Sequence, residues 1–264
     1  MGRLTGIGVL VTRPEHQAQH LCQLIEAEGG TPVRYPALSI RPRTDRAAVR
    51  AAIGPADRYD YVIFISANAA RFGSDLLEQR RDIRLIALAQ PTASALNSAG
   101  YRVSLMPAEG ADSEALLAMP QLAHMSGQRV LIVRGVGGRE LLGEVLTSRG
   151  AQVQYAEVYT REPARPAADV QAQVEQLWRQ GGVRAYSATS VALLEALVGI
   201  VTPRCRELMD STALLTGSRR VADAAIRLGL GSPLILADAP DDAALVSALI
   251  RWRVAAQASN QDGA

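Results

Sequence analysis

The chain has 264 residues, of which 48% are hydrophobic and 20% charged, and its formal net charge is +2. This composition supplies a core for one large domain or two smaller ones, and it lacks the charge excess of disordered or nucleic-acid-coating proteins. All 28 basic residues are arginine, which excludes enzymes that need a lysine nucleophile or a Walker-type lysine. We therefore expect a small-molecule partner and no nucleic acid.

No cationic leader precedes an apolar core, and no apolar run approaches 18 residues, so we expect a cytoplasmic protein without a membrane partner. The two cysteines, Cys22 and Cys205, match no disulfide framework and no metal-binding spacing. His16 and His20 have the spacing of two zinc ligands on one helix face, but no third ligand is patterned nearby. The sequence therefore predicts no metal site. We also expect no cofactor, and we expect a monomer.

Apolar strands alternate with helical patterns along the whole chain. The expected pairs of strand and helix are 8–11 with 15–28, 61–65 with 67–79, 85–88 with 92–99, 102–106 with 113–119, and 130–133 with 140–149. This alternation is typical of parallel sheets that carry helices on both faces. The predicted class is α/β with doubly wound parallel sheets, and the small polar tail after Arg253 is expected to be disordered.

The two halves of the chain resemble each other. LVTRPEHQAQHL near the N-terminus aligns with IVRGVGGRELL, and the Ser-Ala pair at 66–67 aligns with the pair at 187–188. The first strand and helix of the chain match the last strand and helix of the central block, so the duplication is permuted. Chance similarity between amphipathic segments is the competing explanation.

A permuted duplication predicts two domains that share the chain unequally. We expect a discontinuous domain formed by residues 1–38 and 165–264, and an inserted domain formed by residues 42–158. Residues 37–42 and 158–165 would be the extended connecting strands, because prolines flank both segments.

Polar side chains stand where expected strands end and helices begin. Ligands of parallel sheets bind at these ends, where helix N-termini present unpaired amides and a partial positive charge. Thr12 and Glu15 have the spacing of a capping box around Pro14. Helix capping alone would explain any one such residue. Matching copies in both halves of the chain favour an anionic ligand. The candidate binding residues are Thr12, Arg13, Ser66, Ala67, Asn68, Ser187 and Ala188.

The stretch VLIVRGVGGRE suggests an anion-binding loop that includes Gly135. A dinucleotide fingerprint would need glycine where Glu140 stands, which argues against a nucleotide site. Arg134 favours carboxylate recognition, since guanidinium groups bind carboxylates with two hydrogen bonds, and a salt bridge to Glu140 or Glu157 is the structural alternative. Tyr159 on the returning strand carries a phenol that can donate a proton while neutral.

Five motifs are the most distinctive parts of the chain: VLVTRPEHQAQHL, YVIFISANAARF, ADSEALLAMPQL, VLIVRGVGGRELLGEVLTSRGAQVQYAEVYTR and GSRRVADAAIRLG. Together, over roughly residues 8–250, they resemble the uroporphyrinogen-III synthase family. The resemblance implies two flavodoxin-like domains joined by a two-stranded ladder. It also implies a cofactor-free lyase of haem biosynthesis that cyclises hydroxymethylbilane, inverting the last pyrrole ring through a spiro intermediate, chiefly by positioning the substrate between the domains.

The resemblance also implies roles for particular residues. Tyr159 matches the family's proton donor to the departing hydroxyl, Thr92 the threonine of a G-x-x-T turn, and Ser187 the serine of the other domain. This chain departs from the pattern at Ala89 and Pro91 in the first turn. The second turn reads GSRR at 217–220, where Ser218 and Arg219 are candidate substrate contacts.

Three functional hypotheses follow from the sequence. The first is uroporphyrinogen-III synthase activity, with altered contacts or impaired catalysis as a variant because of the changed turns. The second is a bilobal, non-enzymatic binding protein for an anionic small molecule. The third is a nucleotide-sugar transferase, which would need a bound nucleotide.

Overall fold

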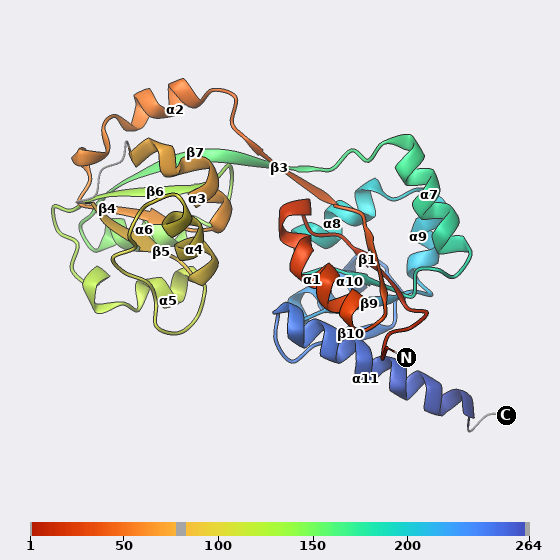
Figure 1. Ribbon diagram of the computed structural model, residues 1–264. Helices are drawn as coiled ribbons and strands as arrows, with labels where there is room; N and C mark the ends of the chain where they lie inside the picture. Colours follow the sequence, from red (N-terminus) through yellow and green to blue (C-terminus); the bar gives the residue numbers. More distant parts are fainter. Residues whose placement is uncertain (1, 78–82, 262–264) are drawn as a thin grey trace. The chain divides into compact units, whose positions relative to one another are not determined.

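The computed structural model describes residues 2–77 and 83–261 and divides into two compact units (Figure 1). The first unit comprises Met1–Ser39 and Glu162–Ala264, and the second comprises Ile40–Arg161. Both crossings between the units fall inside the proline-flanked segments 37–42 and 158–165.

The first unit contains a sheet of five parallel strands in the order β10-β9-β8-β1-β2. Residues of β1, β8 and β9 are all buried, because apolar side chains on both faces meet helices. The strands are β1 (Gly8–Val11), β2 (Thr31–Arg34), β8 (Ala185–Ser187), β9 (Ala213–Thr216) and β10 (Leu234–Leu236).

Six helices cover the two faces of this sheet. On one face α1 and α11 lie side by side, and the other four pack on the opposite face (Figure 1). The helices are α1 (Glu15–Ala27), α7 (Ala168–Arg179), α8 (Val191–Ile200), α9 (Pro203–Met209), α10 (Arg219–Arg227) and α11 (Asp242–Gln261). The expectation of a disordered tail after Arg253 is wrong for the residues up to Gln261, which are helical. The alanine- and glutamine-containing sequence there continues α11. Residues 262–264 lie outside the described part of the chain.

The second unit contains a five-stranded sheet in the order β3-β7-β6-β4-β5. The pairs β4–β5, β4–β6 and β6–β7 are parallel, whereas β3 runs against β7. The Arg43 amide donates to the Val158 carbonyl at 3.0 Å, and the Ala164 amide donates to the Ala37 carbonyl at 2.8 Å. The strands are β3 (Leu38–Pro42), β4 (Tyr61–Phe64), β5 (Arg84–Ala87), β6 (Arg129–Gly135) and β7 (Gln152–Pro163).

Alternating residues of β4 supply two separate cores in this unit. Val62 and Phe64 face α3 and α4, while Tyr61 and Ile63 face α5 and α6. The helices are α2 (Arg46–Ile53), α3 (Ala67–Gly73), α4 (Gln90–Ser98), α5 (Ser113–Leu117) and α6 (Leu141–Ser148), with short 3-10 turns η1 (Ala56–Arg58), η2 (Ser74–Leu77) and η3 (Pro120–Leu122). The helix expected over 67–79 is therefore divided at Gly73, and positions 78 and 79 lie outside the described residues.

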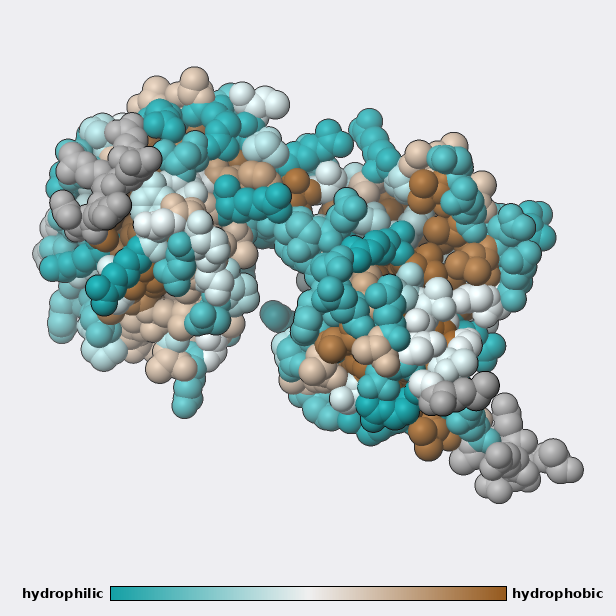
Figure 2. All heavy atoms as spheres, viewed as in Figure 1, coloured by the Kyte–Doolittle hydropathy of each residue, from teal (hydrophilic) through white to brown (hydrophobic). Residues whose placement is uncertain are grey.

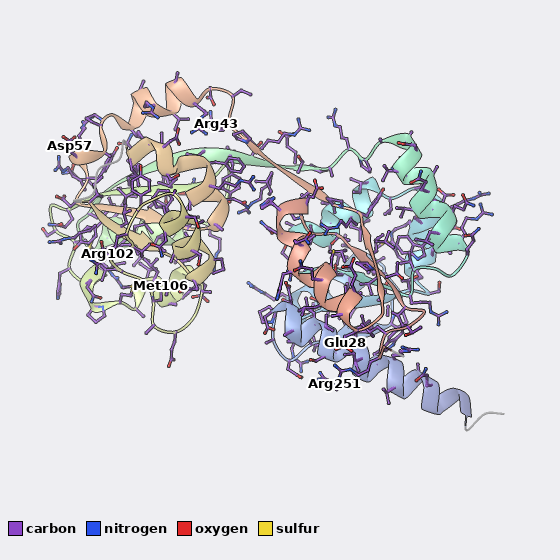
Figure 3. The ribbon with its side chains drawn as sticks, in the orientation of Figure 1. Glu28, Arg43, Asp57, Arg102, Met106 and Arg251 are labelled. Atoms are coloured by element: carbon purple, nitrogen blue, oxygen red, sulfur yellow. The ribbon has the colours of Figure 1, made fainter. Side chains whose placement is uncertain are left out.

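The strand expected over 102–106 does not form. The ends of this segment, Arg102 and Met106, are labelled in Figure 3. Only Leu105 bridges to β5, opposite Ile86. The amides of Ser104 and Leu105 both donate to the same carbonyl, that of Leu85. Two donors on one acceptor interrupt the regular exchange of hydrogen bonds that a parallel ladder needs.

The two sheets share one strand order. The order β2-β1-β8-β9-β10 corresponds to β7-β6-β4-β5 followed by the bridge at Leu105. The segment β1–α1–β2 comes first in its unit, while its counterpart β6–α6–β7 comes last in the second unit. In Figure 2 the visible face of each unit is mainly hydrophilic, with hydrophobic residues in small patches. None of the helices in the described residues combines the length and the apolar character needed to cross a bilayer.

Candidate functional site

The ring of Tyr159 lies against the backbone of Gly135 in the second unit. Gly135 ends β6 and is paired with Tyr159 of β7 just after an irregularity in the register at Arg134. A Cβ on Gly135 would lie 2.6 Å from both Cε2 and Cζ of the phenol ring. Only glycine therefore allows the ring this position, in which Tyr159 is 0% exposed.

Two polar side chains contact the Tyr159 hydroxyl. Nη2 of Arg161 donates to it at 2.8 Å, and Oγ of Ser66 lies 3.1 Å away. The Arg161 guanidinium carbon is 5.5 Å from the centre of the Tyr159 ring, and Phe72 packs against the ring with centres 6.1 Å apart. The phenol oxygen is thus held from two sides.

Ser66 joins this cluster to the start of α3. Its backbone is extended, with φ −164° and ψ 159°, and its Oγ accepts a hydrogen bond from the Ala69 amide at 3.0 Å. This is the geometry of a helix N-cap, which satisfies one of the unpaired amides of the first turn. Ala67 and Asn68 occupy that turn, where Asn68 is 7% exposed and Ser66 is partly exposed.

Thr92 lies in the first turn of α4, which follows β5, and it is 2% exposed. The cap residue Ala89 makes no side-chain hydrogen bond. Its backbone carbonyl accepts a hydrogen bond from the Thr92 amide at 3.0 Å. Pro91 stands in the first turn, where a missing amide hydrogen removes no helical bond. The departures at Ala89 and Pro91 are therefore compatible with a regular helix start.

Arg134 is nearly buried and already paired. Its Nη2 donates to Glu140 at 2.9 Å and to Glu157 at 3.1 Å, and its guanidinium lies 3.8 Å from the centre of the Tyr155 ring. Both structural alternatives for Arg134 are therefore present together. Nε and Nη1 of Arg134 have no partner among the residues that the structure describes.

Electrostatics at Arg134 follow from this arrangement. Burial is the largest influence and lowers the pKa of Arg134, but the hydrogen bonds and charges of Glu140 and Glu157 raise that pKa above its ordinary value. The hydrogen bond from Arg134, followed by one from Tyr155, lowers the pKa of Glu140. Burial, and then Glu140, raises the pKa of the Tyr155 phenol.

The glycine-rich loop after β6 is exposed. Gly137 and Gly138 have φ of 67° and 141°, and Arg139 pairs with Glu114 at 2.7 Å. Helix α6 begins at Leu141, one residue later than expected, and its cap residue Glu140 makes no side-chain capping bond. Glu140 instead directs its carboxylate to Arg134.

In the first unit, Thr12 and Ser187 connect adjacent strands. Both are 0% exposed. Thr12 Oγ1 donates to the Ser187 carbonyl at 2.5 Å, and Ser187 Oγ donates to the Leu10 carbonyl at 3.3 Å. The predicted capping box at Thr12 is therefore wrong: its hydroxyl is engaged by β8, and the cap position of α1 is Pro14.

The start of α8 is capped one turn later than the Ser-Ala pair. Ser190, rather than Ser187, accepts from the Leu193 amide at 3.2 Å. Ala188 is buried, and its amide donates to the Leu215 carbonyl at 3.0 Å. Ala188 therefore extends the pairing at the carboxyl end of the central strand β8 and does not belong to a helix start.

The remaining candidates of the first unit lie just before α1 and at the start of α10. Arg13 forms an ion pair with Asp242, which His20 also contacts at 2.9 Å. Ser218 is the cap residue of α10 but makes no side-chain capping bond, and the next residue, Arg219, is exposed. Within the described residues, no group of three or more His, Cys, Asp and Glu side chains could hold a metal ion.

Sequence reasoning missed Arg161. Residues two apart on a strand point to the same face, so the spacing of Tyr159 and Arg161 on one strand was the available signal. Alternation alone does not say which of the 28 arginines meets a phenol.

Comparison with known proteins gives a consistent result. A family model described as uroporphyrinogen-III synthase HemD matches residues 19–247. The uroporphyrinogen-III synthase of Escherichia coli K12 is 30% identical over 249 residues, covering 92% of this chain and 100% of that protein. The uroporphyrinogen-III synthase of Salmonella typhimurium LT2 is 31% identical over 251 residues, with the same coverage.

Two solved structures are similar in fold. A mutant uroporphyrinogen III synthase of the extreme thermophile Thermus thermophilus superposes with a TM-score of 0.58 at 20% identity, covering 95% of this chain and 99% of that one. The uroporphyrinogen-III synthetase of Helicobacter pylori 26695 gives a TM-score of 0.63 at 13% identity, covering 93% and 99%. At these identities the likeness concerns the α/β fold with parallel sheets alone.

Proposed function

Because the chain belongs to the uroporphyrinogen-III synthase family, we propose that it cyclises hydroxymethylbilane with inversion of the last pyrrole ring, as a cofactor-free lyase of haem biosynthesis. The observation that carries this proposal is the hydroxyl cluster at the strand ends of the second unit. There the Tyr159 phenol is held by Arg161 at 2.8 Å and faces Ser66 at 3.1 Å. Such a cluster can supply a proton without a metal or a histidine.

The proposed reaction begins with loss of the substrate's terminal hydroxyl, for which the site provides the proton. The resulting azafulvene attacks the substituted carbon of the last ring to give a spiro intermediate, which fragments and recloses with that ring inverted. Unassisted closure gives the uninverted isomer. The protein therefore contributes mainly by restricting a flexible chain to one conformation, an effect of positioning.

We assign contacts with the substrate's carboxylates to helix starts rather than to paired arginines. The first turn of α3, with Ala67 and Asn68, and the start of α10, with Ser218 and Arg219, present amides whose partial positive charge favours anions. Thr92, whose amide already donates to the Ala89 carbonyl, would contribute through its hydroxyl at the start of α4.

Two of the arginines singled out by the sequence, Arg134 and Arg13, already pair with acidic side chains. A substrate carboxylate would have to compete with Glu140 and Glu157 for Arg134, and with Asp242 for Arg13. Thr12 and Ser187, both fully buried, would act by fixing the ends of β1 and β8. Gly135 would act by leaving room for the Tyr159 ring.

We further propose that the two units are flavodoxin-like domains connected by the ladder of β3 and β7. The strand order β2-β1-β8-β9-β10, which is the 2-1-3-4-5 order of doubly wound sheets, supports this assignment. A cytoplasmic monomer that acts on one small molecule is the arrangement we propose for the working enzyme.

The direct test gives the purified chain freshly prepared hydroxymethylbilane and separates the products by isomer. We expect the inverted isomer to predominate with the protein and the uninverted isomer to predominate in an incubation without it. Formation of the uninverted isomer at the same rate in both incubations would refute the proposed activity.

A Tyr159→Phe variant should form the inverted isomer more slowly without unfolding, and unchanged turnover would remove the role assigned to Tyr159.

A further inference from the structure

The phenol of Tyr159 is placed where a ligand cannot touch it. Tyr159 is 0% exposed and belongs to the apolar core beside α3 and α4. Ser66, its hydrogen-bond neighbour at 3.1 Å, is partly exposed at the start of α3. A proton that leaves Tyr159 therefore has to pass Ser66 to reach the surface.

The donors and acceptors determine the direction of each hydrogen bond in this cluster. A guanidinium can only donate, so the Tyr159 oxygen accepts from Arg161. The Ala69 amide likewise donates to Ser66 Oγ at 3.0 Å. What remains open is the bond between the two hydroxyls, in which either oxygen can be the donor.

The buried hydrogen of the Tyr159 hydroxyl needs an acceptor, and this need determines which of the two hydroxyls donates. If Ser66 donated to Tyr159, the phenol hydrogen would have no acceptor among the described residues. A buried donor without a partner carries its full desolvation cost. If Tyr159 donates, Ser66 Oγ uses both lone pairs, one for the Tyr159 hydrogen and one for the Ala69 amide. The hydrogen of Ser66 is then the one that remains available to a ligand.

We infer that Ser66 is the catalytic group that delivers the proton, that Tyr159 acts through it, and that Arg161 is a positioning residue that directs the phenol hydrogen toward Ser66. This inference rests on the proposed function and specifies which atom meets the substrate. It replaces direct donation by Tyr159 with a relay of two hydroxyls.

The relay step balances as follows in the proposed reaction. The carbon–oxygen bond of the terminal hydroxymethyl group breaks, and its electron pair leaves with the oxygen, which takes the Ser66 proton and departs as water. The lone pair of the pyrrole nitrogen stabilises the carbon that remains. Ser66 takes the proton of Tyr159, and the phenolate accepts a hydrogen bond from Arg161. The proton released when the ring closes restores the phenol.

Substitutions at Ser66 can separate proton delivery from helix capping. Ser66→Asn keeps a good cap but has no transferable proton, whereas Ser66→Thr keeps both the cap and the hydroxyl. We expect Ser66→Asn and Tyr159→Phe each to lower kcat roughly 100-fold, the low end for general acid catalysis, with little change in KM. Ser66→Thr should stay within about threefold of the unmodified chain, and the double variant should be no slower than the slower single variant, because the two groups act as one unit.

Other outcomes would overturn the relay. Full activity of Ser66→Asn beside an impaired Tyr159→Phe would mean that the phenol acts directly. Multiplied losses in the double variant would mean that the two hydroxyls act independently. For Arg161, kcat should fall in Arg161→Met and recover in Arg161→Lys, which can still donate; equal losses in both variants, or a change confined to KM, would remove its positioning role.

A measurement without turnover separates the relay from the proposed function. Neutron diffraction of the deuterated protein should place the Tyr159 deuteron between Oη and Ser66 Oγ, with the Ser66 deuteron pointing away from Tyr159. The reverse orientation would refute the relay even in an active enzyme. The predicted orientation in a protein that forms no inverted isomer would instead refute the proposed function and leave the hydrogen-bond assignment standing.

Discussion

Gly135→Ala is the substitution whose effect the structure defines most closely. The added Cβ would lie 2.6 Å from two carbons of the Tyr159 ring, about 1 Å inside normal contact distance. Moving the ring by about 1 Å lengthens the 3.1 Å contact to Ser66 beyond hydrogen-bond range. Overpacking costs about 1–3 kcal/mol, and loss of the hydrogen bond adds about 1 kcal/mol. We therefore expect a loss of roughly 2–4 kcal/mol in the free energy of unfolding.

Urea unfolding measures this loss, and the ratio of isomers formed from hydroxymethylbilane measures its effect on the site. Gly137→Ala is the matched control two residues further on, because a Cβ there meets no atom within 4 Å and only the φ of 67° opposes it. That strain should cost about 1 kcal/mol and leave the isomer ratio unchanged.

A Gly135→Ala protein within about 0.5 kcal/mol of the unmodified chain, with an unchanged isomer ratio, would refute the reasoning. It would mean that the ring can move away from Gly135 without cost, so that its placement against the glycine has no role in holding the phenol.

Three further predictions concern Arg134, its partner Glu140, and the buried phenol of Tyr186. Arg134→Met should lower the free energy of unfolding by about 3 kcal/mol, because it leaves Glu157 partly buried without this partner, and equal urea midpoints would contradict this. The pKa of Glu140 lies below its ordinary 4.5, so the stability that Glu140 contributes is present above that pH and is lost as the pH falls through the lowered pKa. Glu140→Gln should therefore reduce the fall in unfolding free energy at acid pH. An equally steep fall in both proteins would count against the Arg134–Glu140 pair. Burial raises the pKa of Tyr186 from 10.0 to about 12, so its contribution is complete below about pH 10 and about 3 kcal/mol is lost as the pH rises to about 12. Tyr186→Phe should remove that alkaline loss in urea titrations, and an unchanged loss would refute the assignment.

Much of the fold follows from local patterns. Runs such as 61–64 and 130–133 are apolar at consecutive positions, as expected of strands covered on both faces, and both are buried strands of one sheet. The sequence also predicts a permuted pairing, because the first strand and helix of the chain match the last strand and helix of the central block. Helix ends were less predictable, since α3 ends at Gly73, where packing against Val133 and Val158 leaves no room for a side chain.

The candidate site was less accessible to sequence reasoning because its decisive contacts are distant along the chain. Thr12 looked like a cap from its neighbours, but its acceptor is the carbonyl of Ser187 in another strand. For Arg134 the sequence offers either a ligand carboxylate or a salt bridge to Glu140 or Glu157, and only the tertiary structure shows both glutamates on the same nitrogen. Local spacing reveals which groups can bond, whereas tertiary pairing determines which of them remain free.

The permuted order of strands has a consequence for how the chain acquires its structure during synthesis. All strands of the second unit lie in one continuous stretch, so this unit can close soon after residue 161 leaves the ribosome. Strand β1 emerges first, yet it must await its neighbour β8, more than 170 residues later in the sequence. Nascent β1, α1 and β2 therefore leave apolar surface uncovered until β8 has been synthesised, and completing this sheet is a long-range closure.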